Sequence, residues 1–326
     1  MVKCSVWKKL STVLILIGSC LTGCSTLQPS SESQPTMVQQ IMPEGELIAR
    51  GFKNTRKNEL YNVESLIGFF QKIDDRINRK VRIVQIGDSH IRGHIFPAVL
   101  RQNLAEKWGS DAMANQKIDY YTSALAEETG KDGFIFHAIG KNGATIAYFM
   151  KPKQLDEIAK LQPDLIIISV GTNESHMVFN AEVYGQKLDQ FISEMKMRMA
   201  KQGNEIAFLL TTPPCSHLSN IKTEEYIGED GQLHSKKTKI KIANPVTSDV
   251  AQFQYAYAEK HGIALWNLYE IAGGKESACS NWWNGEFMAK DGIHYTKRGY
   301  TIQAKLLGSA LLNAYFDYKK SQEKIR

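Results

Sequence analysis

Four short stretches of the chain carry residue types that could form a hydrolytic site. The first is Gly87-Asp-Ser89, which follows an apolar, β-branched run that starts at Val81 and predicts a buried strand. Ser89 would lie at the carboxyl end of that strand and just before a helix, where open α/β sheets form their sites. Backbone N–H groups there favour negative charge. Ser89 is therefore a candidate nucleophile, although an ordinary helix-capping turn has the same composition.

The second and third stretches offer hydrogen-bond donors. Gly143 follows a strand, and the missing side chain would let a backbone N–H face a ligand. Asn173 follows the most apolar run of the chain, residues 165–170, and would present its amide at the same sheet edge as Ser89. Donors of both kinds stabilise oxyanions. Each stretch alone is also typical of a simple turn.

The fourth stretch is Asp291-Gly-Ile-His294, in a loop before the last predicted helix. The spacing lets the Asp291 carboxylate reach one ring nitrogen of His294 while the other faces a nucleophile. The carboxylate would fix the tautomer and stabilise the imidazolium, and the histidine would act as a general base and then as an acid. A capping turn is the structural alternative.

In order and position, the four stretches resemble the motifs of the SGNH (GDSL-type) hydrolases, and the resemblance covers residues 81–315. It implies a flavodoxin-like three-layer α/β/α fold with a central parallel sheet. It also implies that Ser89 is the nucleophile, His294 the base and Asp291 the residue that orients it. The oxyanion donors would be the N–H groups of Ser89 and Gly143 and the Asn173 side chain. The resemblance implies no metal and no other cofactor.

A subgroup is indicated by residues 87–93, 142–144 and 171–174, which resemble the peptidoglycan O-acetylesterases and related acetylesterases of Gram-negative bacteria. The resemblance implies a serine esterase that removes O-acetyl groups from a cell-envelope polysaccharide through an acetyl-enzyme. Some relatives carry an inserted carbohydrate-binding domain, which the short interval between Ser89 and Gly143 cannot hold. Three alternatives stay open: a polysaccharide O-acetyltransferase, an esterase acting on small or lipid substrates, and a non-catalytic glycan-binding lipoprotein.

The elements that would position these residues alternate between strand and helix, which predicts a parallel sheet with right-handed crossovers and helices on both faces. Strands are predicted at residues 82–86, 117–122, 134–139, 165–170, 205–211 and 263–268. Helices are predicted at residues 63–73, 93–108, 153–161, 181–202, 247–261 and 298–315.

Residues 215–244 interrupt this alternation and form a basic insertion. Lysines alternate with apolar residues in the run from Ser235 to Ile242, which predicts an exposed hairpin or edge strand; a basic flap over an anionic polymer is the functional alternative. Trp282 and Trp283 precede Asp291, and they would either stack on sugar rings at the rim of the site or close the core.

The N-terminus has the layout of an export signal. Basic residues precede a short apolar run, which ends in Leu21-Thr-Gly-Cys24 and resembles a bacterial lipoprotein box. The resemblance implies a signal peptide at residues 1–23, lipidation of Cys24, and an exported protein anchored to a membrane. Ser25 favours the outer membrane, where the protein would face the periplasm or lie at the cell surface. Residues 24–46 are rich in Ser, Gln, Pro and Thr and predict a flexible tether before a hydrolase domain at 47–326.

Composition sets further limits. The 326 residues are 43% hydrophobic and 23% charged, which is typical of a globular chain. The formal charge of +6 includes three lysines of the signal, so the exported chain is too weakly basic to indicate a nucleic-acid partner. Cys215 and Cys279 would remain in an oxidising compartment, either as a disulfide or as two free thiols.

Overall fold

The apolar runs of the sequence form a central sheet in the computed structural model, which describes residues 43–114 and 124–325. The sheet has the strand order β1-β8-β5-β4-β2-β3, and the five strands from β8 to β3 are parallel. This is the flavodoxin-like order, with β2 between β4 and the edge strand β3. Its strands are β1 Leu60–Tyr61, β2 Lys80–Gly87, β3 Gly133–Gly140, β4 Leu165–Ser169, β5 Ala207–Thr211 and β8 Ala264–Trp266.

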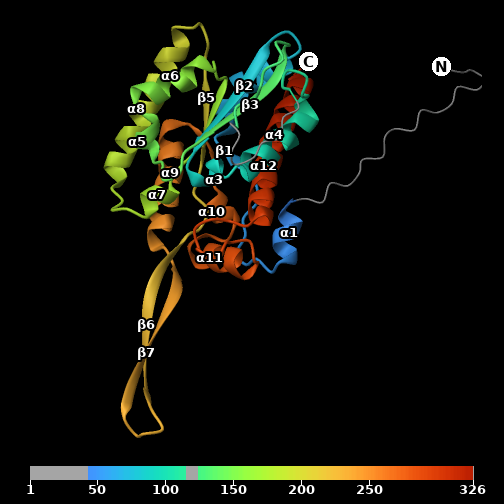
Figure 1. Ribbon diagram of the computed structural model, residues 1–326. Helices are drawn as coiled ribbons and strands as arrows, with labels where there is room; N and C mark the ends of the chain where they lie inside the picture. The colour runs from blue at the N-terminus through green and yellow to red at the C-terminus, as the bar shows by residue number, and fades with distance from the viewer. Residues whose placement is uncertain (1–42, 115–123, 326) are drawn as a thin grey trace, which may run out of the picture. The chain divides into compact units, whose positions relative to one another are not determined.

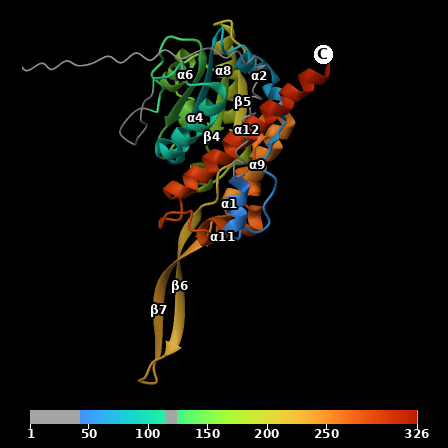
Figure 2. The ribbon, with the colours of Figure 1, turned by 90° about the vertical axis from the view of Figure 1, so that its right-hand side faces the viewer.

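Alternating side chains of the strands build a hydrophobic core on each face of the sheet. Ile83 and Ile167 lie on one face, whereas Val84 and Ile166 lie on the other, and all four are buried. Figures 1 and 2 show the helices arranged on both sides of the sheet. The face with Ile83 packs against α1 Pro43–Ala49, α2 Ile67–Asp74, α4 Ile95–Trp108, α10 Leu268–Ile271, α11 Gly274–Asn284 and α12 Lys297–Ile325. The opposite face packs against α5 Ile146–Phe149, α6 Pro152–Lys160, α8 Ala181–Ala200 and α9 Pro245–His261.

Three further helices are short: η1 Val63–Leu66, α3 Ser89–Arg92 and α7 Thr172–Ser175. The last two follow β2 and β4 directly. The carboxyl ends of three adjacent strands, β4, β2 and β3, therefore open into the loops that carry Asn173, Ser89 and Gly143.

The expected three-layer α/β/α fold is confirmed, with differences at its margins. The sheet is not wholly parallel, because the short strand β1 pairs with β8 in the antiparallel sense. Residues 43–46, predicted as part of the flexible tether, begin helix α1, which Leu47 anchors in the core. The predicted strand at 117–122 lies outside the described residues, as do the signal peptide and Cys24.

The basic insertion forms a separate two-stranded antiparallel hairpin, β6 His217–Ile227 and β7 Leu233–Ala243, as the alternation of its residues predicts. It extends away from the central sheet in both ribbon views (Figures 1 and 2). Most of its residues are exposed. Within residues 43–114 and 124–325, no helix combines the length and the apolar character needed to cross a membrane.

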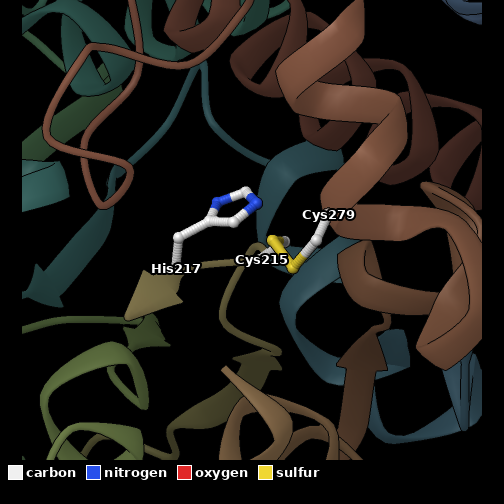
Figure 3. A group of neighbouring side chains, drawn as sticks. All are labelled: Cys215, His217 and Cys279. Atoms are coloured by element: carbon white, nitrogen blue, oxygen red, sulfur yellow. A yellow bond between two sulfur atoms is a disulfide. The ribbon is translucent and has the colours of Figure 1, made fainter. Parts of the chain in front are cut away.

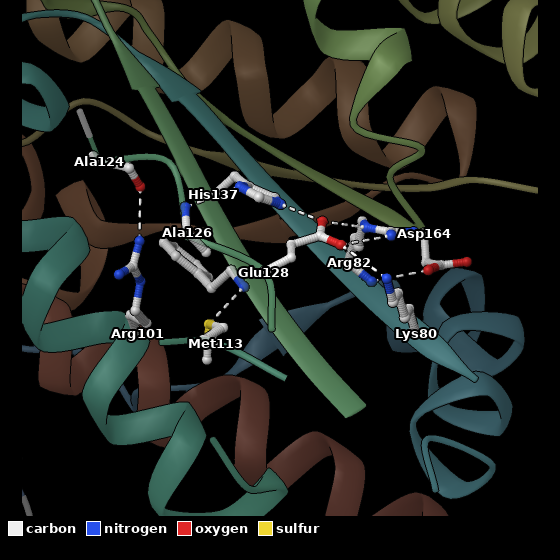
Figure 4. Close-up of polar contacts among 10 residues, drawn as sticks. Lys80, Arg82, Arg101, Met113, Ala124, Ala126, Glu128, His137 and Asp164 are labelled. Carbon is white, nitrogen blue, oxygen red and sulfur yellow. Dashed lines mark hydrogen bonds and ion pairs between the residues drawn. The ribbon is translucent and has the colours of Figure 1, made fainter. Parts of the chain in front are cut away.

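A polar cluster fastens the segment before β3 to the sheet (Figure 4). The Glu128 carboxylate accepts hydrogen bonds from Nε and a terminal nitrogen of Arg82, at 2.8 and 2.9 Å. It also lies 3.3 Å from both Lys80 Nζ and His137 Nε2. Arg82 and Lys80 belong to β2 and His137 to β3, so a single carboxylate ties the segment to two neighbouring strands.

Candidate active site

The Ser89 turn is built by a strand that ends in glycine and a helix that begins with the serine. Asp88 caps α3, and its carboxylate accepts a hydrogen bond of 2.9 Å from the His90 N–H. The turn packs closely against β3, because a Cβ at Gly140 would lie only 2.2 Å from the Arg92 backbone nitrogen. Gly87 is similarly confined by the Ile91 side chain. The glycines thus allow the serine turn to sit directly on the sheet edge.

Ser89, His294 and Asp291 form a continuous chain of hydrogen bonds. His294 Nε2 lies 2.9 Å from Ser89 Oγ, and Nδ1 lies 2.7 Å from an Asp291 carboxylate oxygen. The second Asp291 oxygen accepts the backbone N–H groups of Ile293 and His294, both at 2.9 Å. The geometry lets His294 take the Ser89 proton while Asp291 holds the ring in one tautomer.

The loop around Asp291 is held in place from two sides. Its ends are joined by the bridge between Met288 and Tyr295, and its Gly292 carbonyl accepts a hydrogen bond of 2.7 Å from the His217 N–H. Lys241 of the hairpin donates to the Asp291 carbonyl. Partial burial raises the pKa of the Asp291 carboxyl, but the hydrogen bonds from His294 and the two backbone N–H groups outweigh it, so the pKa lies below its usual value. Asp291 is therefore ionised beside His294 at neutral pH.

The three donors predicted for an oxyanion lie beyond the carboxyl ends of three adjacent strands, β2, β3 and β4. The Ser89 N–H stands at the start of α3, where N–H groups have no helical partner. Gly143 adopts a φ of +72°, the left-handed region, in a turn closed by a 3.0 Å bond from the Ala144 N–H to the Lys141 carbonyl. Lys141 in turn donates to the carbonyl of Gly87.

Asn173 is oriented by that same glycine loop. Its Nδ2 donates to the Ala144 carbonyl at 2.9 Å and lies 3.4 Å from the Asp88 carboxylate. The next residue, Glu174, accepts a 2.9 Å hydrogen bond from the Ile146 N–H, and burial raises its pKa. These two hydrogen bonds join the segments that follow β3 and β4.

Asp88 and His90, the two neighbours of Ser89, also shape the site, and neither is among the predicted site residues. Burial raises the pKa of Asp88 to about 7, and burial followed by the nearby His294 lowers the pKa of His90 to about 3. His90 is thus neutral at pH 7, and its Nδ1 lies 3.0 Å from the Tyr300 hydroxyl. Its ring centroid is 5.6 Å from that of His294. In the sequence, the feature that could have indicated a role for Asp88 and His90 is their position next to Ser89.

The two tryptophans have different environments. Trp282 is completely buried and packs edge-on against Phe52, Phe287 and Tyr295, so the proposed rim position is wrong for this residue and the core alternative holds. Trp283, the next residue along the same helix, points to the other side and is 39% exposed. Its ring centroid lies 5.1 Å from that of His217, at the base of the hairpin.

Cys215 and Cys279 are joined as a disulfide, which fixes the segment after β5 to α11 (Figure 3). The His217 ring lies beside them, and one ligand atom of each of the three residues falls within 4.8 Å of the others. Cysteine binds metal as a thiolate, so the paired sulfurs do not offer the ligands that such a cluster would need.

The family model of GDSL-like lipases and acylhydrolases matches residues 83–307, more than half of the chain. The protein therefore belongs to this family of SGNH/GDSL ester hydrolases. Comparison with curated proteins gave no match.

Solved structures are similar to this chain at low sequence identity. A peptidoglycan O-acetylesterase is similar with a TM-score of 0.59 and 18% identity, covering 78% of this chain and 96% of that one. An acetyl xylan esterase gives a TM-score of 0.47 and 15% identity, covering 71% and 99%. A lipolytic G-D-S-L protein from Veillonella parvula DSM 2008 gives 0.41 and 16%, covering 70% and 96%.

Proposed function

We propose that this protein is a serine esterase that removes O-acetyl groups from a cell-envelope polysaccharide, with peptidoglycan as the substrate. The observation that carries the proposal is the chain Asp291–His294–Ser89, with hydrogen-bond distances of 2.7 and 2.9 Å. The strand order, which brings the loops of Gly143 and Asn173 to the same sheet edge, supports it. The motifs that resemble peptidoglycan O-acetylesterases support the substrate, and one solved structure with this fold is such an enzyme.

In the proposed mechanism, Ser89 Oγ attacks the acetyl carbonyl carbon while His294 Nε2 accepts the hydroxyl proton. The carbonyl oxygen becomes an oxyanion, which the N–H groups of Ser89 and Gly143 and the Asn173 amide stabilise. His294 then gives the proton to the leaving sugar oxygen, and an acetyl-Ser89 ester remains. Water, deprotonated by His294, attacks this ester, so acetate leaves and Ser89 recovers its proton.

The proposal includes export and a lipid anchor on Cys24, which would hold the enzyme at the outer membrane facing the periplasm, next to its polymer. The N-terminal motif supports this part. Labelling of cells with a radioactive fatty acid tests it: label on the wild-type protein and none on Cys24→Ser is expected. Equal labelling of the two proteins would contradict it.

The first experiment measures acetate release from O-acetylated peptidoglycan, acetylated xylan and a small chromogenic acetate, for wild type and Ser89→Ala. We expect wild-type release that strongly favours peptidoglycan, and a loss of about 10³-fold or more in the variant, because the nucleophile is removed. Matched thermal melts show that the variant is folded.

Other outcomes would redirect the proposal. Full activity of Ser89→Ala would refute the mechanism. Serine-dependent release from the small ester alone would keep the mechanism and refute the polymer substrate. Transfer of the acetyl group to an added oligosaccharide, in place of water, would identify a transferase.

A further inference from the structure

The β6–β7 hairpin is larger than protection of a sheet edge requires. Each strand has eleven residues, which gives a length on the order of 35 Å, whereas strands in globular proteins are typically about five or six residues long. Two-stranded sheets are marginally stable by themselves. A long, exposed hairpin of this kind is therefore a candidate binding surface.

The register sorts the charges of the hairpin onto two unlike faces. Lys237, Lys239 and Lys241 lie on one face, opposite Thr223, Ile221 and Ser219. Glu225, two residues beyond Thr223, is the carboxylate on this face. No ion pair joins Lys237 or Lys239 to a carboxylate anywhere in the described part of the chain. We call this face, with its three lysines, the basic track.

The opposite face has a smaller positive charge. It carries Lys222 and Lys236, and Lys222 forms an ion pair of 2.7 Å with Glu224. Farther along, His234 stacks on Tyr226 and bonds to Asp230. The basic track thus carries three lysines against one carboxylate, Glu225, whereas the opposite face carries two lysines against one carboxylate, Glu224.

The basic track leads directly to the candidate active site. Lys241 donates to the Asp291 carbonyl, and a Cβ at Gly292 would lie 3.4 Å from Lys241 Cδ. Beyond Lys241 on the same face comes His217, which packs on the half-exposed Trp283. Lysines two positions apart on a strand are about 7 Å apart, which is less than the Debye length of about 8 Å, so their potentials add.

We propose that the basic track is a docking surface for an anionic glycan polymer, which it guides to Ser89. This inference rests on the proposed function and specifies it: peptidoglycan carries free carboxylates on its peptide stems, whereas acetylated xylan backbones are neutral. A membrane surface is the less favoured occupant, because the exposed apolar Ile227 and Leu233 near the tip are accompanied by the carboxylates of Glu229 and Asp230, which anionic lipids would repel.

The test compares two variants of the full-length protein with the same change in charge. Lys237→Gln/Lys239→Gln alters the basic track, and Lys222→Gln/Lys236→Gln alters the opposite face. Neither pair belongs to the candidate catalytic machinery. We expect the track variant to raise KM for O-acetylated peptidoglycan roughly three- to tenfold, to weaken its salt dependence, and to leave turnover of the small acetate unchanged. The control variant should resemble wild type in every assay.

A binding measurement separates failure of this inference from failure of the proposed function. Cosedimentation with insoluble peptidoglycan is measured for both pairs in the Ser89→Ala background, so it needs no turnover. Weaker binding of the track pair alone supports docking even if peptidoglycan proves not to be hydrolysed. Equal binding and equal KM for the two pairs would overturn it. The track pair is also tested for binding to anionic phospholipid vesicles. If it binds these vesicles less well than wild type and binds peptidoglycan equally well, the docking proposal is overturned in favour of a lipid surface.

Discussion

Asn173, which we propose as an oxyanion donor, is oriented by contacts with two neighbouring loops. Its amide is positioned by the Ala144 carbonyl, in the loop after the neighbouring strand, and by the Asp88 carboxylate beside Ser89. A side chain held from two sides loses little freedom when a negative charge develops nearby, which is the condition for electrostatic stabilisation.

We predict that Asn173→Ala lowers kcat for the small chromogenic acetate by about 10²–10³-fold with little change in KM, because the donor acts mainly on the oxyanion of the transition state. Steady-state kinetics at saturating ester measures this. Asn313→Ala, an exposed asparagine on α12, is the control. A variant with wild-type kcat would remove Asn173 from the oxyanion site.

At the scale of elements, the Glu128 cluster shows how the edge of the sheet is secured (Figure 4). β3 is an edge strand, and the segment before it is tied to β2 through Arg82 and Lys80. The hydrogen bonds from Arg82 lower the pKa of Glu128 to about 2, against an opposing effect of burial and with support from Lys80 and His137. The carboxylate thus stays charged in the folded protein at pH values where it is protonated in the unfolded chain.

A depressed pKa makes the contribution of Glu128 to stability depend on pH. The stabilisation is complete above the ordinary glutamate value of about 4.5 and is lost as the pH falls towards 2. We predict that Glu128→Gln lowers the free energy of unfolding at pH 7 by about 1–3 kcal/mol, because charged hydrogen bonds are lost.

Urea unfolding of wild type and Glu128→Gln from pH 7 to pH 3 measures this difference, which should shrink as the pH falls. Glu157→Gln, which removes an exposed ion pair of 3.9 Å on α6, is the control and should have little effect. A difference between wild type and Glu128→Gln that stays constant with pH would contradict the assignment.

At the scale of the whole molecule, the disulfide joins parts that are distant in the chain. Cys215 and Cys279 are 64 residues apart and enclose the hairpin and α9 (Figure 3). Closing a loop of that length restricts the unfolded chain, and the entropy model gives about 4 kcal/mol, with measured effects commonly smaller. The bond also lies next to His217, which contacts the loop of Asp291.

We predict that Cys215→Ser/Cys279→Ser lowers the free energy of unfolding by about 2–4 kcal/mol. Denaturant unfolding under oxidising conditions measures this change. A reductant should destabilise the wild type by a similar amount and leave the variant unaffected, which serves as the control. An identical unfolding midpoint for the oxidised and reduced wild type would show that the crosslink is not formed in solution.

The sequence by itself determined the alternation of the main strands and helices and the residues near the ends of the central strands. This was possible because strand and helix periodicities differ, and because Gly87-Asp-Ser89, Asn173 and Asp291 with His294 stand at strand ends or in a loop, where local patterns are readable. Gly143 is also readable from the local sequence, because its left-handed backbone conformation favours a residue without a side chain.

Only the tertiary structure decided which of these residues meet. Strand order places β4, β2 and β3 side by side, and it thereby brings Asn173, Ser89 and Gly143 to one edge. Trp282 and Trp283 have the same chemistry but point in different directions from α11, so their burial depends on what packs there. The same holds for the pairing of Cys215 with Cys279 and for the face of the hairpin that meets the Asp291 loop, because contacts between distant segments depend on packing geometry that no local pattern contains.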